Sequence, residues 1–413
     1  MDSKSSVSLS TLFAFGPAGI IWAFLPVHLY SLNASYTIIS MVSLIPAAET
    51  ILFSPFWGGL LDRTGNGRRI ILAALLAETA GFSLFPILTS PIEFVIVVSL
   101  IGLFTSSFIP VFSAMATWAS GQYGRAIGGF WIAASLGYGV STLLGGVVYE
   151  FYGATDLFIL GALFGLAGCL TVVLLDKNIL STTVDVQSSR GYVGLLRQRN
   201  ILTLCIVSIL AIIATSSFNS FFTVYLVDTL GTSRLLAGIA AAATTLLGAV
   251  AFRFIGPLND KVGRKPVFML GTTGYVLYFL TIYLITNSFI VTILWILPLY
   301  PFIQSSAAAL VSDYTSKADR GKGLGLLEAA ISLGGGLGPL AGGLIADRLS
   351  LRSVMIFSLS TALTATIASR LFIRESLTRK GSPIRLESGV ATRVSIAVRV
   401  SRGDFLSHKP PSF

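Results

Sequence analysis

The sequence predicts an all-α membrane protein with twelve transmembrane helices arranged as two pseudo-symmetric six-helix bundles. Hydrophobic residues make up 54% of the chain and charged residues only 11%, whereas a soluble domain has about 25% charged residues. Lipid must therefore cover part of the surface. Many apolar runs reach the length of about 20 residues that a helix needs to cross the hydrocarbon core. A short polar motif also occurs twice, half a chain apart.

The apolar runs, taken in order, give the predicted membrane spans. They cover residues 9–31, 36–60, 69–89, 92–118, 125–149, 154–175, 200–227, 234–257, 266–286, 288–313, 322–346 and 351–373. Several spans contain proline, for example Pro17 and Pro298. Membrane helices tolerate proline because neighbouring helices satisfy the freed backbone groups.

An internal repeat divides the chain into two halves. Residues 124–146 resemble residues 321–343 at an offset of 197, so both halves run in the same direction and a site is expected between them near the midplane. In chain order, the predicted units are an N-terminal bundle (1–175), a cytoplasmic linker (176–199), a C-terminal bundle (200–373) and a basic cytoplasmic tail (374–413).

The distribution of Lys and Arg predicts the orientation. The net charge is +10, and the basic residues are concentrated in alternate loops, as expected for loops that stay in the cytoplasm. Both termini are therefore predicted to be cytoplasmic in a multi-pass protein of the plasma membrane. The basic residues do not gather on one soluble module, which argues against nucleic acid as a partner.

The repeated polar motif follows the second predicted span of each half. The first copy contains Gly58, Asp62, Arg63, Gly65, Arg68 and Arg69, and the second contains Gly256, Asp260, Lys261, Gly263, Arg264 and Lys265. Glycine permits close helix approach and a turn with positive φ. A carboxylate at the membrane face suits the free N–H groups and positive dipole end of a helix N-terminus.

Together, the two loop motifs, the glycine-rich fifth and eleventh spans and the six-plus-six layout resemble the major facilitator superfamily over residues 9–373. The resemblance implies a secondary transporter that works by rocker-switch alternating access. It also implies that Asp62 contacts the start of the eleventh span (321–325) and Asp260 the start of the fifth (124–128). These contacts would latch the halves on the cytoplasmic side in the outward-open state. A plain turn with cytoplasmic charges is the alternative.

Ionisable residues inside membrane spans are costly and usually functional. The sequence places four there: Glu49, Glu78, Arg253 and Glu328. We expect them to bind substrate or to take part in coupling. For Glu49 the alternative is a water-exposed wall position. Arg253 and Glu328 lie at similar depth, so a structural ion pair is an alternative to a substrate or gating role.

The resemblance also implies that the first, fourth, seventh and tenth spans line the central cavity. The candidate contact residues on these spans are Trp22, Asn219, Tyr225, Trp295 and Gln304. Aromatic residues are common at the lipid interface as well, which is an alternative position for Tyr225.

The expected cargo is a small, partly apolar organic molecule, and export of hydrophobic compounds is the favoured direction. Uptake of a sugar or an organic anion, with Arg253 contacting the anion, is the alternative. The sequence contains no nucleotide loop, paired catalytic carboxylates or His/Cys cluster, so we expect neither an enzyme or receptor nor a cofactor or metal. The other expected partners are the lipid bilayer and a coupling proton, with uniport as the open alternative. A monomer is expected.

Overall fold

The computed structural model describes residues 3–120, 123–175, 191–316 and 319–376, with the side chains of 3–4 and 118–127 outside that description. Within these ranges the chain is helical, and it contains 12 helices long and apolar enough to cross a membrane. The predicted all-α membrane fold is confirmed. Of the predicted tail and linker, most residues lie outside the described ranges.

The first half contains seven α-helices and a short 3-10 turn after α3. The α-helices are α1 (Ser3–Ser31), α2 (Tyr36–Thr64), α3 (Gly67–Leu84), α4 (Pro91–Thr105), α5 (Phe108–Ser120), α6 (Tyr123–Phe151) and α7 (Ala154–Val173).

The second half contains the remaining helices. They are α8 (Tyr192–Leu196), α9 (Arg199–Asn219), α10 (Phe222–Val224) with the π-helical turn Tyr225–Thr229, α11 (Arg234–Val262), α12 (Arg264–Leu284), α13 (Ser288–Ile296), α14 (Tyr300–Tyr314), α15 (Arg320–Arg348) and α16 (Leu351–Phe372).

Three predicted spans are interrupted helices. The fourth span divides into α4 and α5, the seventh into α9, α10 and the π-turn, and the tenth into α13 and α14. Interrupted helices leave backbone groups without intrahelical partners, and membrane proteins tolerate them where the protein itself surrounds them. Transporters commonly build binding sites at such interruptions.

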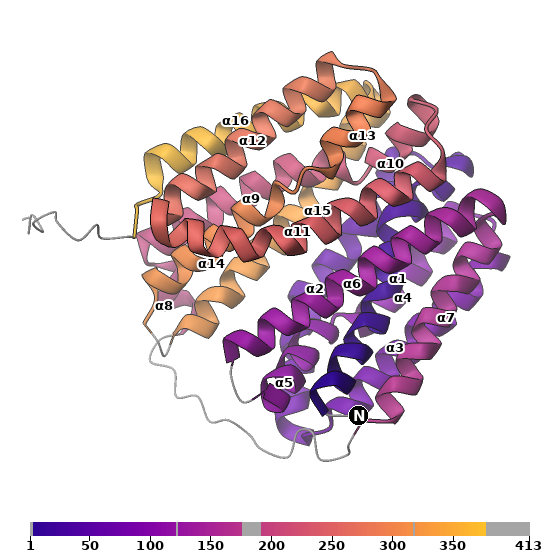
Figure 1. The fold of residues 1–413 in the computed structure, drawn as a ribbon, viewed down its shortest axis with the longest axis horizontal. Helices are drawn as coiled ribbons and strands as arrows, with labels where there is room; N and C mark the ends of the chain where they lie inside the picture. The colour runs from indigo at the N-terminus through magenta and orange to yellow at the C-terminus, as the bar shows by residue number, and fades with distance from the viewer. Residues whose placement is uncertain (1–2, 121–122, 176–190, 317–318, 377–413) are drawn as a thin grey trace, which may run out of the picture. The chain divides into compact units, whose positions relative to one another are not determined.

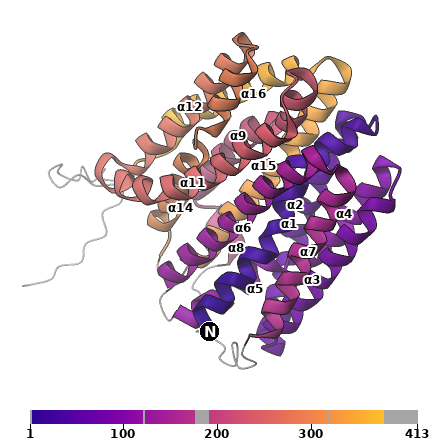
Figure 2. The ribbon, with the colours of Figure 1, turned by 45° about the vertical axis from the view of Figure 1, so that its right-hand side comes forward.

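Because successive spans alternate in direction, the turns fall at two ends. We call the end with the two loop motifs, around Gly65 and Gly263, the motif end, and the end with the turns before α2, α11 and α16 the far end. The N-terminus and α8 lie at the motif end, and α10 lies toward the far end (Figure 1). The halves meet where α2 packs along α15 and α6 along α11, and Figure 2 shows α6 beside α11 from a second direction.

The buried core changes along this axis. Toward the far end, residues of both halves form one continuous cluster that includes Phe24 and Phe94 from the first half and Phe218 and Phe279 from the second. Toward the motif end, the clusters are separate, with one in the first half and two in the second. Among the described residues, a shared apolar cluster therefore joins the halves toward the far end, and the clusters at the motif end stay within one half each.

Candidate functional site

Glycines bring the backbones of the two halves together at the far end. A Cβ atom at Gly146 of α6 would lie only 3.0 Å from the Cα atom of Gly238 in α11. Likewise, a Cβ atom at Gly343 of α15 would lie 2.7 Å from the carbonyl oxygen of Tyr36 in α2. Contact continues to mid-helix, where Gly139 faces Leu246. Such small residues permit the close helix approach that drives packing in membranes.

The same helix pairs are apart at the motif end. A Cβ atom added at Gly58 of α2, Gly256 of α11 or Gly325 of α15 would meet no heavy atom within 4 Å. Together with the separate core clusters, this places the molecule in a conformation that is closed at the far end and open between the halves at the motif end.

The predicted latch contact between Asp62 and the start of α15 is not found among the described residues. Asp62 is exposed at the end of α2, and Asp260 instead pairs with Arg264 of its own half at 3.0 Å. The start of α6, the expected partner of Asp260, lies mostly in residues whose side chains are outside the description. Because the latch is expected to separate when the motif end opens, its role in the opposite state stays a prediction.

The motif glycines adopt the expected backbone conformations. Gly65 ends α2 with φ 61°, and Gly263 ends α11 with φ 117°. The basic residues differ between copies. Arg68 donates from Nη2 to the carbonyl oxygen of Val173 at 2.5 Å, whereas Arg63, Arg69 and Lys261 are exposed at the motif end.

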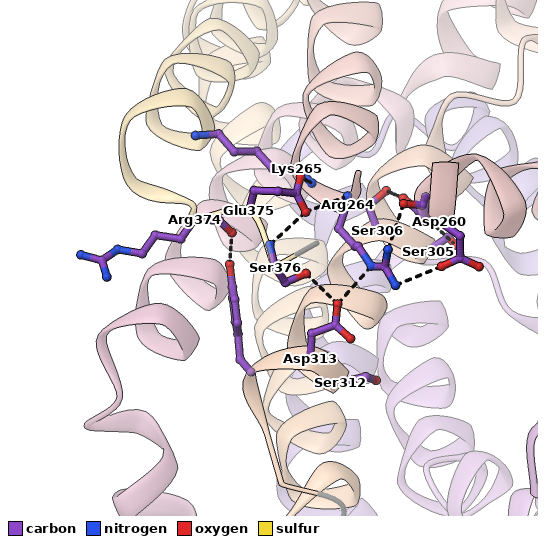
Figure 3. A network of polar contacts seen from close by, with 12 residues as sticks. Asp260, Arg264, Lys265, Ser305, Ser306, Ser312, Asp313, Arg374, Glu375 and Ser376 are labelled. Carbon is purple, nitrogen blue, oxygen red and sulfur yellow. Dashed lines mark hydrogen bonds and ion pairs between the residues drawn. The ribbon is translucent and has the colours of Figure 1, made fainter. Parts of the chain in front are cut away.

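In the second copy, the motif belongs to a polar network that the sequence did not reveal (Figure 3). Arg264 joins Asp260 and Asp313 of α14, each at 3.0 Å. Ser376, beyond α16, donates its hydroxyl hydrogen to Asp313 at 2.6 Å. Glu375 accepts hydrogen bonds from the backbone N–H groups of Arg264 (3.2 Å) and Lys265 (3.0 Å). The chain after α16 is thereby held against the second motif.

That network moves a predicted boundary. The tail was predicted to begin at 374, but residues 374–376 contact the second half: the Tyr314 hydroxyl donates to the Arg374 carbonyl oxygen, in addition to the bonds of Glu375 and Ser376. Lys265 Nζ also donates to the Arg370 carbonyl oxygen at 2.7 Å. Glu375, two residues past the last apolar run, gave no signal of this contact in the sequence, because its capping role depends on where the start of α12 lies in the folded protein.

The two acidic candidates of the first half, Glu49 and Glu78, are buried between helices. Glu49 of α2 is 9% exposed and accepts a hydrogen bond from the Ser99 hydroxyl at 2.7 Å. Its second oxygen, Oε2, lies against Gly102 of α4 and has no partner. Glu78 of α3 is 3% exposed, and its Oε2 is also unpartnered. Glu49 therefore faces α4, and the alternative of a water-exposed wall residue is wrong for this conformation.

Arg253 and Glu328 have different surroundings. Both side chains are exposed. Among the described residues, the ion pairs are those of Arg264 with Asp260 and Asp313, and no ion pair joins Arg253 to Glu328. The structural-pair alternative is not realised in this conformation. Their substrate or gating role stays a prediction.

Two of the predicted cavity residues meet at the interrupted helices of the second half. Trp295, just before the break between α13 and α14, donates from Nε1 to Asn219 Oδ1, at the end of α9, at 3.2 Å. The Trp295 ring packs on Phe222 with centroids 4.4 Å apart. The Thr244 hydroxyl of α11 donates to the Trp295 carbonyl oxygen at 2.9 Å. This cluster places the exposed Asn219 amide beside the half-buried Trp295 ring, which packs on the fully buried Phe222.

The remaining predicted contacts lie outside this pair. Tyr225 is only 3% exposed and packs against Phe218 and Phe222, so it supports the cluster from within the protein rather than facing lipid. Trp22 of α1 is 45% exposed, and Gln304 of α14 is half-buried. Neither has a contact with the Asn219–Trp295 cluster among those found in the described chain.

Comparison with known proteins shows which family this chain resembles along its length. A family model described as Major Facilitator Superfamily matches residues 7–199 and 204–409. A "Multi-drug resistance efflux pump PmrA homolog" of Lactococcus lactis subsp. lactis is 24% identical over 365 residues, which cover 84% of this chain and 89% of that protein. "Multidrug resistance protein MdtG" of Klebsiella pneumoniae is 24% identical over 385 residues, covering 89% and 92%.

Solved structures support the fold. The nucleoside transporter NupG superposes with a TM-score of 0.78 at 14% identity, covering 91% of this chain and 100% of that one. A bacterial homolog of the human lysosomal transporter Spinster, in an inward-facing and unoccupied conformation, gives a TM-score of 0.71 at 15% identity, covering 90% and 97%.

Proposed function

Because the chain belongs to the Major Facilitator Superfamily, we propose that this multi-pass membrane transporter exports small hydrophobic organic compounds from the cell by alternating access. The relatives that match along most of the chain are named as a multidrug efflux pump and a multidrug resistance protein. Those names favour export over uptake of a sugar or an organic anion. The protein acts as a carrier and not as an enzyme.

The observation that carries this proposal is the unequal contact between the halves. The motif end is open and the far end is closed by shared core packing and by the Gly146–Gly238 approach. Lys and Arg are concentrated at the motif end, so this end faces the cytoplasm. The conformation is then the one in which an exporter receives its cargo from the cytoplasm or the inner leaflet.

The Asn219–Trp295 cluster is the proposed cargo contact. Cargo of mixed polarity needs apolar surface with a few placed polar groups, and this cluster supplies the Trp295 ring, supported by the buried Phe222, beside the Asn219 amide. Aromatic faces also attract organic cations. The cluster therefore suits flat, partly apolar molecules better than highly hydroxylated sugars.

Glu49 and Glu78 are the proposed coupling residues, with the proton as the coupling ion. A carboxylate that is buried without a cation and with an unpartnered oxygen is strongly disfavoured, so such a group takes up a proton instead. Each acid has one unpartnered, buried oxygen in this conformation. Alternating exposure of either carboxyl would bind a proton on one side and release it on the other.

Reconstituted protein tests the proposal directly. Liposomes with an imposed pH gradient should move ethidium, a hydrophobic cation, against its concentration gradient, and dissipating the gradient should stop movement. A sugar and a dicarboxylate serve as alternative cargoes in parallel vesicles. Movement of either of these without ethidium transport would reject the export proposal.

A further inference from the structure

At the far end, a carboxylate from each half reaches across to the other half. Asp347, at the end of α15, accepts hydrogen bonds from the backbone N–H of Tyr36 at 2.7 Å and of Thr37 at 2.9 Å. It also accepts a bond from the Thr37 hydroxyl at 2.6 Å. Tyr36 and Thr37 are the first residues of α2. The start of a helix has free N–H groups and the positive end of the dipole, so a carboxylate is stabilising there.

The second bridge has the same form. Glu150, at the end of α6, accepts a hydrogen bond from the backbone N–H of Arg234 at 2.8 Å. Arg234 is the first residue of α11 in the other half. Its guanidinium carbon lies 4.6 Å from the ring centroid of Tyr149, which adds a cation–π contact across the same boundary.

The two bridges are related by the internal repeat. Glu150 and Asp347 are separated by 197 residues, and so are their partners Thr37 and Arg234. One arrangement of acceptor and helix start therefore occurs twice, from the first half to the second and from the second to the first. The bridges lie beside the close approaches of Gly146 and Gly343.

We propose that Asp347 and Glu150 are gating residues that hold the far end closed, and that both must release before the pathway opens there. The proposal rests on the alternating-access function proposed above. Opening at the far end moves the start of α2 away from α15 and the start of α11 away from α6. Each helix start then loses its carboxylate and must be solvated by water.

The two bridges do not contribute equally. Asp347 accepts three hydrogen bonds, whereas Glu150 accepts one, from the backbone N–H of Arg234. Loss of Asp347 therefore has the larger effect on closure of the far end. Both carboxylates are exposed, and an exposed cap contributes a moderate amount that thermal motion overcomes. A gate of this strength favours the closed far end while still letting it open in each cycle.

Cysteine labelling on intact cells tests the gate. The chain has two cysteines, Cys169 and Cys205, both buried, and replacing both with serine gives a blank background. Leu246→Cys is the reporter, because Leu246 packs on Gly139 across the halves. A membrane-impermeant maleimide reaches it from outside only when the far end opens. We expect Asp347→Ala to raise the labelling rate about fivefold and Glu150→Ala about twofold.

Glu93→Ala is the matched control. Glu93 also lies at the far end and accepts hydrogen bonds from two helix-start N–H groups, those of Thr89 and Ser90, both at 3.0 Å. These groups immediately precede its own helix, α4, so its loss lowers stability without releasing a bridge between halves. The labelling rate should stay at the background value. The conservative variant Asp347→Glu should label more slowly than Asp347→Ala.

Several outcomes overturn the gate. Unchanged labelling in both alanine variants and in the double variant rejects it, and so does an equal rise in Glu93→Ala. Leu349→Cys, at an exposed far-end position, must label in intact cells for each comparison. Increased labelling in Asp347→Ala with no cargo moved by the unaltered protein supports the gate and counts against the export proposal, so the two failures are distinguishable.

Discussion

At the scale of single residues, the bond between Trp295 and Asn219 gives the sharpest test of the cargo site. Trp295→Phe keeps a ring to pack on Phe222 but removes the indole donor, and Asn219→Ala removes the acceptor. We expect each variant to raise the KM for ethidium several-fold with little change in kcat. The loss of binding free energy in the double variant should be smaller than the sum of the two single losses, with a coupling energy of about 0.5–1.5 kcal/mol. If the two losses simply add, the Trp295–Asn219 hydrogen bond does not contribute to cargo binding.

Glu49 and Glu78 can be compared by the same kind of substitution. Glu49→Gln keeps an amide group that bonds to Ser99 but cannot exchange a proton. If Glu49 carries the coupling proton, transport driven by a pH gradient should fall at least about tenfold, whereas cargo exchange without a gradient should continue. Parallel measurement on Glu78→Gln assigns the role to one acid or to both. Full gradient-driven transport in the two variants would remove both from coupling.

At the scale of helices, Gly238 controls how closely α11 approaches α6. A Cβ atom there would lie 2.8 Å from the Cα atom of Gly146, and backbone cannot move aside as a side chain can. Gly238→Ala should therefore disfavour the closed far end by about 1–3 kcal/mol, measured as faster labelling of the Leu246→Cys reporter. Gly256→Ala on the same helix has open space around it and should leave labelling unchanged. Equal labelling in the two variants would contradict this view of the interface.

The start of α12 depends on a residue beyond the last helix. Glu375→Ala removes the carboxylate that accepts from the N–H groups of Arg264 and Lys265. Loss of such a cap costs about 0.5–2 kcal/mol, so the purified variant should melt at a lower temperature in a thermal-shift measurement. Ser376→Ala, which removes one bond to Asp313, should melt closer to the unaltered protein. The reverse order would assign the stability to the Asp313 side of the network.

The helices also show which structural features could be predicted from the sequence and which could not. The number and positions of the membrane spans could be predicted from the apolar runs, because the thickness of the bilayer sets the length that each run must have. Run length did not show where helices continue past the membrane: α2 was predicted to end at 60 and ends at Thr64, and α11 was predicted to end at 257 and ends at Val262. The break after α4 was not predicted, since it involves the Trp57 indole donating to the Leu103 carbonyl oxygen and the Ser106 hydroxyl, each at 3.0 Å.

For the candidate site, rarity of charge identified Glu49 and Glu78, but composition cannot show which neighbour a helix face meets. Their burial against other helices became clear only from the packing. Asp347 and Glu150 were missed because acids near loops are common and carry no signal of their own. Their equivalence under the repeat is the signal that was present in the sequence, where each follows a pair of glycines by four residues.

At the scale of the whole molecule, orientation is the prediction on which direction of transport depends. In the cysteine-free background, Leu349→Cys at the far end should react with an impermeant maleimide on intact cells. Thr64→Cys, exposed at the motif end, should react only after the cells are permeabilised. The positive-inside bias gives this expectation. The opposite pattern would place the open end outside the cell and would reverse the predicted topology.

The paired bridges of Asp347 and Glu150 have an evolutionary consequence. In an isologous homodimer, residue i of one copy contacts residue j of the other, and the reverse contact forms as well. The two bridges have that form. A symmetric dimer of two separate six-helix polypeptides would carry the same pair of contacts at its interface, so the bridges fit an origin of the two halves by duplication and fusion.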